Sequence, residues 1–214
     1  MLALCYQRCN LAVHRRDSEY NEEGSLNVRE AYEDSLDREG HVEDPAQLEV
    51  VACFEDLQSR IAAQRPRHGM LRALLRRDAP RNPVRGLYVW GGVGRGKTFL
   101  MDLFFGELDV ERKSRIHFHR MMRDVHARLK ALDGVEDPLD TVAADIARET
   151  RVLCFDEFFV SDIGDAMILA SLLAGLFDRG VTLVATSNAH PGDLYKDGLQ
   201  RQRFLPAIDL LCAH

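Results

Sequence analysis

The sequence predicts a three-layer α/β fold, in which helices cover both faces of a mainly parallel β-sheet. From about residue 84 onward, short apolar runs alternate with segments of helical periodicity, which is the pattern of strands joined by crossover helices. Two runs, at 151–155 and 181–186, are apolar almost throughout, as strands buried on both faces require. A glycine-rich turn at 91–98 lies between an earlier apolar run and a helical segment. Together these observations predict a three-layer α/β core with a mainly parallel sheet.

Composition and charge are those of a globular protein and argue against some partners. The 214 residues, 46% of them hydrophobic, suffice for one sizeable domain plus a tail or for two small domains. The net charge of −6 gives no electrostatic reason to expect nucleic-acid binding. No apolar run is long enough to span a bilayer, so membrane contact is expected to be peripheral at most. Five cysteines without a Cys-x-x-Cys pair favour reduced thiols and a cytoplasmic location.

Residues 1–44 are predicted to form an acidic N-terminal arm. Aspartate and glutamate dominate between Asp17 and Asp44, where Arg29 and Arg38 are the main opposing charges. Such a segment is most simply solvated and disordered, although residues 26–36 could form a short helix. The sequence indicates no function for this arm.

Residues 45–83 are predicted to form a helical segment followed by a basic linker. Leu48, Val51, Leu57 and Ile61 recur at helical spacing, and Pro45 suits the first turn. Seven arginines follow between residues 65 and 85. Because no aromatic residues accompany them for base stacking, we favour a solvated surface over a site for nucleic acid or phospholipid headgroups. Turn-forming residues at 78–83 mark the boundary of a core domain predicted at 84–214.

The glycine-rich turn has the pattern of a phosphate-binding P-loop: Gly, four residues, Gly, Lys, Thr. Its glycines let the backbone approach phosphates closely, and the following helix adds its positive N-terminal end. Lys97 is expected to reach the β- and γ-phosphates, and the Thr98 hydroxyl to ligate Mg²⁺. The predicted nucleotide-binding residues are Gly91, Gly92, Val93, Gly94, Arg95, Gly96, Lys97, Thr98 and Phe99.

Six further elements are predicted beyond the P-loop helix. A strand at 115–119 precedes a helix that ends near 132, and a short helix begins near 142. The buried strand at 151–155 leads to a helix that ends near 178, and the second buried strand follows at 181–186. His117 and His119 would share one side of the first strand; because no third ligand accompanies them, we favour packing over metal binding.

Polar residues follow both buried strands. Asp156 and Glu157 come directly after one strand, at the end where α/β sheets bind ligands. Asp156 is predicted to hold Mg²⁺, and Glu157 to position and deprotonate an attacking water. Asn188 follows the other strand and is a candidate for contacting the γ-phosphate and the water. An asparagine that simply forms a turn is the alternative at this position.

Several blocks of the sequence resemble the ZapE cell-division ATPases and their mitochondrial relatives. The similarity covers about residues 45–210 and excludes residues 1–25. It lies in GLYVWGGVGRGKT at 86–98, MDLF at 101–104, HFHRMM at 117–122, LCFDEFFVSDI at 153–163, ATSN at 185–188 and LQRQRFLPAI at 199–208.

The resemblance implies an AAA+-like ATPase that assembles into a ring and binds ATP with Mg²⁺ at the interface between subunits. In such a family Asn188 matches the sensor residue. Arg201 and Arg203 match the segment that carries an arginine finger for the neighbouring subunit, and both remain candidates. The implied client is a protein, namely the division-ring protein FtsZ in bacteria or a protein under membrane quality control in mitochondria.

The resemblance also implies that the core at 84–214 is incomplete. The family continues beyond the last residue of this chain, so a fifth core strand and a helical lid are expected to be missing, and a sheet edge to be left unpaired. Three hypotheses follow. The favoured one is Mg-dependent ATP hydrolysis that remodels a protein partner, in bacterial cell division. The alternatives are a nucleotide-binding module without turnover and a DNA-associated AAA+ motor or loader.

Overall fold

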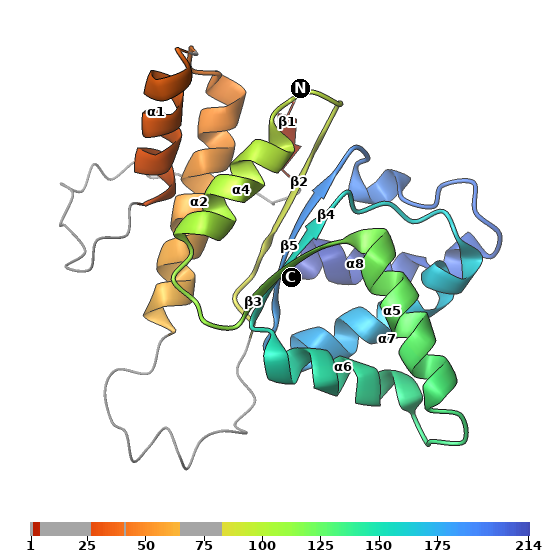
Figure 1. Ribbon diagram of the computed structural model, residues 1–214. Coiled ribbons are helices and arrows are strands. Elements are labelled where there is room, and N and C mark those ends of the chain that lie inside the picture. Colours follow the sequence, from red (N-terminus) through yellow and green to blue (C-terminus); the bar gives the residue numbers. More distant parts are fainter. Residues whose placement is uncertain (1, 5–26, 41, 65–82) are drawn as a thin grey trace, which may run out of the picture.

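The computed structural model describes residues 2–4, 27–40, 42–64 and 83–214, and Figure 1 shows their arrangement around one twisted sheet. Half of the predicted acidic arm at 1–44, namely residues 5–26, lies outside the described residues. The arginine-rich linker at 65–82 also lies outside them. What was predicted for these two segments stays a prediction.

The sheet is mainly parallel, as predicted. Its strand order is β1-β2-β5-β4-β3. The parallel strands are β2 (Leu87–Gly91), β5 (Thr182–Ser187), β4 (Val152–Asp156) and β3 (Lys113–His117). Because β5 lies between β2 and β4, the segments that follow these three strands meet at one edge of the sheet, the one formed by the carboxyl ends of the parallel strands.

The expectation that the outer side of the P-loop strand is unpaired is wrong. We expected a missing fifth strand to leave an edge unpaired, but β1 (Leu2–Leu4) pairs antiparallel with β2, with Leu2 opposite Gly91 and Leu4 opposite Val89. The N-terminal residues of the chain therefore supply backbone partners along the P-loop strand. This strand was missed because three residues are too few to show an alternating pattern.

Helices cover both faces of the sheet, so the predicted three layers are confirmed (Figure 1). One face carries α1 (Val28–Glu39), α2 (Pro45–Ala63) and α4 (Lys97–Glu107), which enclose one hydrophobic cluster with alternate residues of the strands. The other face carries a second cluster and the helices α5 (Phe118–Ala131), α6 (Pro138–Glu149), α7 (Ile163–Asp178) and α8 (Leu205–Ala213). None of the helices in the described ranges is long and apolar enough to cross a bilayer.

Part of the predicted arm is folded. Helix α1 begins with a capping box, in which Asn27 and Glu30 each accept a hydrogen bond from the other's backbone N–H. Val28 and Tyr32, on the inner side of this helix, are fully buried. The alternative of a short helix at 26–36 is therefore confirmed, and the favoured interpretation of a solvated arm is wrong there, because the acidic residues occupy the exposed side while a short apolar stripe packs on the core.

Strand β3 ends earlier than predicted. It stops at His117, and α5 begins at Phe118 without a connecting loop. His119 therefore lies on a helix, and the interpretation that His117 and His119 share one side of a strand is wrong. Phe118 is fully buried, which fixes the point where the chain turns from strand to helix.

Candidate nucleotide-binding site

The P-loop connects β2 to α4, as predicted. Gly94 and Gly96 have φ angles of 77° and 78°, in the left-handed region that favours glycine. Helix α4 has no side-chain cap at its N-terminus. Its first N–H groups therefore lack the side-chain acceptor that most helices provide, and they are available to an anion.

The Lys97 ammonium lies against the loop. It donates to the carbonyl oxygens of Gly91 and Gly92, both at 2.8 Å. Burial lowers the pKa of Lys97 from its usual value, because a charge held among neutral groups is less well solvated. A cation held by neutral carbonyls, beside an uncapped helix N-terminus, fits a phosphate chain as ligand.

The other loop residues differ in exposure. Val93, Arg95 and Thr98 are exposed. Phe99 is half-buried, and its ring lies 6.2 Å from that of Tyr32 in α1. The first turn of α4 is thus held from the side by an N-terminal helix, while the loop itself faces outward.

Three strands bring the predicted polar residues to the same sheet edge. Trp90 of β2 pairs with Ser187 of β5, and Phe155 of β4 pairs with Ala185 of β5. Asn188 therefore follows the strand between the P-loop strand and the strand that ends at Asp156. Asn188 and Glu157 are exposed, whereas Asp156 is buried.

Glu157 has a backbone conformation that is unusual for a residue with a side chain. Its φ angle is 54°, in the left-handed region, which costs of the order of 1 kcal/mol for a residue other than glycine. Hydrogen bonds hold it: its N–H donates to Thr186 Oγ1 at 3.3 Å, and the N–H of Phe158 donates to the carbonyl oxygen of Thr186 at 2.7 Å. This sharp turn buries Phe158 and leaves the Glu157 carboxylate at the surface of the sheet edge.

Asp156 has a partner that the sequence did not indicate. Arg115 of β3 donates to both of its carboxylate oxygens, from Nε at 2.7 Å and from Nη2 at 3.2 Å, and from Nη1 to Asp102 of α4. Burial acts to lower the pKa of Arg115, but the two carboxylates outweigh it and raise that pKa. The predicted strand at 115–119 holds two histidines besides this arginine, so nothing in the sequence singled out Arg115.

The P-loop also has an unpredicted neighbour in α2. Gln47 Nε2 donates to the carbonyl oxygen of Arg95 at 3.3 Å, and Gln47 Oε1 accepts from the Tyr32 hydroxyl at 3.1 Å. Gln47 lies beside the apolar stripe that predicted α2, and nothing in the sequence distinguished it from a solvated residue. Its role depends on how α2 packs beside the loop.

The two candidate arginines lie in a short 3-10 helix, η2 (Arg201–Arg203), and the side-chain hydrogen bonds described for them do not involve the P-loop. Arg201 is half-buried and donates from Nη2 to the carbonyl oxygen of Gly192 at 2.6 Å. Arg203 is exposed and donates to Gln200 Oε1 at 3.1 Å. Arg203 is therefore the more accessible of the two.

The residues present fit Mg²⁺ held together with a nucleotide. Thr98 and Asp156 offer oxygen ligands, the kind that Mg²⁺ prefers. The described residues contain no group of three His, Cys, Asp or Glu side chains that could hold a metal by themselves. One carboxylate plus substrate phosphates is the usual way in which Mg²⁺ is bound beside a P-loop.

The parallel sheet, the P-loop and the carboxylate-bearing edge define the fold of a P-loop nucleoside triphosphatase. The crystal structure of DnaI has a similar fold, with a TM-score of 0.52 and 17% sequence identity over 79% of this chain and 82% of that chain. A family model for AFG1-like ATPases matches residues 26–214. The chain therefore belongs to the AFG1-like ATPase family.

Curated relatives share this part of the sequence. Cell division protein ZapE of Escherichia coli (strain K12) is 49% identical over 199 residues, which are 89% of this chain and 53% of that protein. Lactation elevated protein 1 homolog B of Danio rerio is 49% identical over 141 residues, 61% of this chain and 28% of that protein. The chain thus spans about half the length of ZapE.

Proposed function

We propose that this chain binds Mg²⁺–ATP at the P-loop and hydrolyses the γ-phosphate. One observation carries the proposal. The P-loop, Asp156, Glu157 and Asn188 come from three adjacent parallel strands and meet at one edge of the sheet. Membership in an ATPase family supports the same activity.

Each residue has a distinct task in this proposal. Lys97 and the N–H groups of the loop bind the phosphates, and Thr98 and Asp156 hold Mg²⁺. The bound metal neutralises charge that develops on the transferring phosphoryl group. Glu157 accepts a proton from the attacking water, and Asn188 orients that water toward the phosphate.

Glu157→Gln separates hydrolysis from binding. The amide keeps the shape of the side chain but cannot accept the proton, so phosphate release is expected to fall by about 10²–10⁴-fold while ATP affinity is kept. Phosphate release and calorimetric titration with ATP measure the two effects. Glu136→Gln, an exposed glutamate at the turn between α5 and α6, is the matched control and should change neither. Unchanged turnover in Glu157→Gln would rule out its role as the base.

Lys97→Ala tests the binding step itself. Loss of the ammonium is expected to weaken Mg²⁺–ATP binding, because Lys97 supplies a positive charge for the phosphates within the loop, where it is held at 2.8 Å from the carbonyl oxygens of Gly91 and Gly92. A nucleotide-binding module without turnover is the alternative function. It predicts that the unaltered chain binds ATP in a Lys97-dependent way and releases no phosphate above background.

We further propose that hydrolysis serves to remodel a protein partner in bacterial cell division, in the cytoplasm. The similarity to a protein named for cell division supports this role. The partner is then a division-ring protein such as FtsZ, and the active form is a ring of subunits. Co-sedimentation of polymerised division-ring protein with this chain should depend on ATP and be lost in Lys97→Ala; nucleotide-independent co-sedimentation would contradict it.

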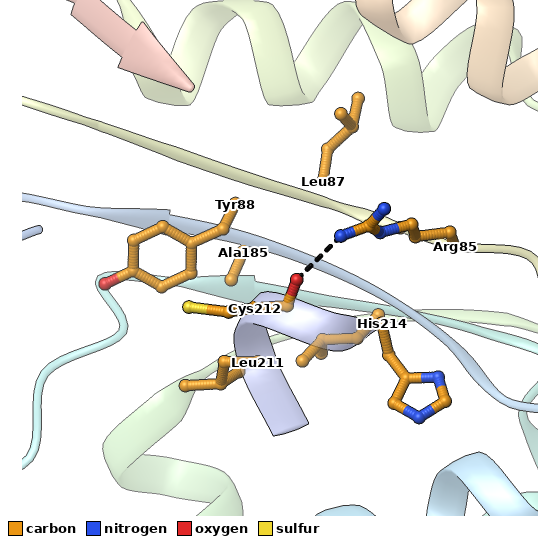
Figure 2. A pocket seen from close by; sticks show the side chains of 9 residues that line it. Arg85, Leu87, Tyr88, Ala185, Leu211, Cys212 and His214 are labelled. Carbon is orange, nitrogen blue, oxygen red and sulfur yellow. Dashed lines mark hydrogen bonds between the residues drawn. The ribbon is translucent and has the colours of Figure 1, made fainter. Parts of the chain in front are cut away.

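A role as a DNA-associated motor or loader is the weaker candidate. The likeness to DnaI is a likeness of fold alone. Most of the arginine-rich segment that suggested DNA, at 65–82, lies outside the described residues. Arg85, which follows it, donates to the carbonyl oxygen of Cys212 at 2.8 Å (Figure 2). Salt-dependent DNA binding that is lost in an Arg72→Ala, Arg76→Ala, Arg77→Ala triple variant would favour this candidate.

A further inference from the structure

Arg115 connects the P-loop helix to the carboxylate that ends β4. It lies in β3 opposite Cys154, and Asp156 lies two residues further along β4. Residues two apart on a strand share a face, so Arg115 and Asp156 project from the same face of the sheet. Cys154 packs in the cluster beneath α4, so this is the face that α4 covers.

The contacts between these groups are close and shielded. The guanidinium donates to both carboxylate oxygens of Asp156, and its third donor, Nη1, donates to Asp102 of α4. Asp102 lies five residues after Lys97. The Arg115 side chain is 18% exposed and the Asp156 side chain 10%. A bidentate pair in such a setting fixes the plane of the carboxylate as well as its position.

Lys113 provides a natural comparison within the same strand. It lies two residues before Arg115, and its ammonium donates to the carbonyl oxygens of Phe105 and Leu108 at the end of α4. Lys113 and Arg115 therefore both attach β3 to α4. Their roles differ because Arg115 also contacts Asp156.

We propose that Arg115 is a positioning residue for the metal-binding carboxylate, and that it sets how strongly Mg²⁺ enhances nucleotide binding. The inference rests on the proposed function, since it concerns the same site. A carboxylate offers about four acceptor positions, of which the guanidinium takes two. The remaining positions on Asp156 are free for Mg²⁺ or its bound waters. Partners that orient a ligating carboxylate contribute strongly to metal affinity.

The charge of the cluster favours support of the metal over competition with it. A guanidinium alone beside Asp156 would cancel the carboxylate charge that attracts Mg²⁺. Asp102 adds a second negative charge to the same guanidinium, so two carboxylates and one cation leave a net charge of −1. Asp156 is thereby fixed in place while the cluster still attracts a cation.

The test compares nucleotide affinity with and without Mg²⁺. Calorimetry would measure the Kd of a non-hydrolysable ATP analogue in excess Mg²⁺ and in EDTA, and the ratio of the two values gives the Mg²⁺ enhancement. In Arg115→Ala we expect this enhancement to fall by about 10–100-fold. The Kd in EDTA should stay the same, because Arg115 has no contact with the P-loop backbone among the described hydrogen bonds.

Two further variants make the result specific. Lys113→Ala removes the neighbouring attachment of β3 to α4 and should keep the full Mg²⁺ enhancement. If Arg115 only attached β3 to α4, the loss of Lys113 would lower the enhancement as well. Arg115→Lys keeps the charge but loses the bidentate geometry, so it should recover only part of the enhancement. It also serves as the test variant if Arg115→Ala does not fold.

The outcomes separate this inference from the proposed function. Enhancement that is unchanged or increased in both Arg115 variants, with normal enhancement in the unaltered chain, overturns the inference and leaves the proposed function standing. Absence of analogue binding by the unaltered chain in either condition overturns both.

Discussion

Gly86 lies directly before β2, against the backbone of β5. A Cβ added there would overlap the carbonyl oxygen of Leu183, and neither strand can move away without breaking the parallel pairing that follows at Leu87 and Val184. This glycine is required for close approach of two strands rather than for its φ angle.

Gly86→Ala is therefore expected to destabilise the fold by about 3 kcal/mol or more, as overpacking against backbone does. Gly106→Ala is the matched control, because a Cβ there meets nothing within 4 Å and lies in a helix; its effect should stay within about 1 kcal/mol. Urea denaturation measures both values. Equal stabilities of the two variants would show that the strands yield at Gly86.

Residue by residue, the sequence predicted the chemistry of the site better than its supports. The order of residues from Gly91 to Thr98 predicts phosphate binding by itself, and Asp156 and Glu157 are recognisable as carboxylates that follow an apolar strand. Arg115 and Gln47 were missed, since each acts through a contact with a residue far away in the sequence. The separations are 41 residues for Arg115 and Asp156 and 48 for Gln47 and Arg95.

Helix α2 holds α4 at both ends through two glutamines. Gln47 Nε2 donates to Arg95 in the P-loop at 3.3 Å, and Gln58 Nε2 donates to Glu107 at the other end of α4 at 2.6 Å. Both are amide to carbonyl hydrogen bonds from the same helix. They differ in that Gln47 is the one beside the nucleotide loop.

Gln47→Ala is expected to weaken binding of the ATP analogue by about 2–10-fold, the usual net value of one such hydrogen bond. Gln58→Ala should leave the affinity unchanged, although it removes an equivalent hydrogen bond and should lower stability by about 1 kcal/mol. Calorimetry and urea denaturation check the two effects. Equal affinities in both variants would mean that α2 supports the fold but not the loop.

At the scale of the whole molecule, the proposed ring would place one subunit's arginine beside the nucleotide of the next. Arg203 suits this role better than Arg201, because Arg203 is exposed whereas Arg201 is half-buried and bound to Gly192. We therefore propose Arg203 as the residue that reaches the neighbouring subunit.

Mixing two inactive variants tests this proposal. Arg203→Ala subunits keep Glu157, and Glu157→Gln subunits keep Arg203, so a mixed interface holds one complete site. A 1:1 mixture is expected to recover about a quarter of the unaltered phosphate release if subunits combine at random. Arg201→Ala replaces Arg203→Ala in the control mixture, which should release no more phosphate than Arg201→Ala by itself, because Arg201 contacts Gly192 of its own subunit. Recovery in the mixture with Arg201→Ala, but not in the mixture with Arg203→Ala, would assign the contact with the neighbouring subunit to Arg201.

The sequence by itself determined the α/β class, the P-loop and the carboxylates after β4, because these depend on periodicity and on motifs within a few residues. At α1 it left a short helix open, although the acidic composition favoured a solvated arm, and it gave no sign of β1, whose three residues are defined by their pairing with β2.

Only the tertiary structure decided what surrounds the phosphate loop. The pairing of Arg115 with Asp156 depends on the register of β3 against β4, and the contact of Gln47 with Arg95 depends on how α2 packs on α4. These contacts join residues more than 40 positions apart, and no local pattern records them. Packing brings together charges and hydrogen-bonding groups that the order of residues keeps separate.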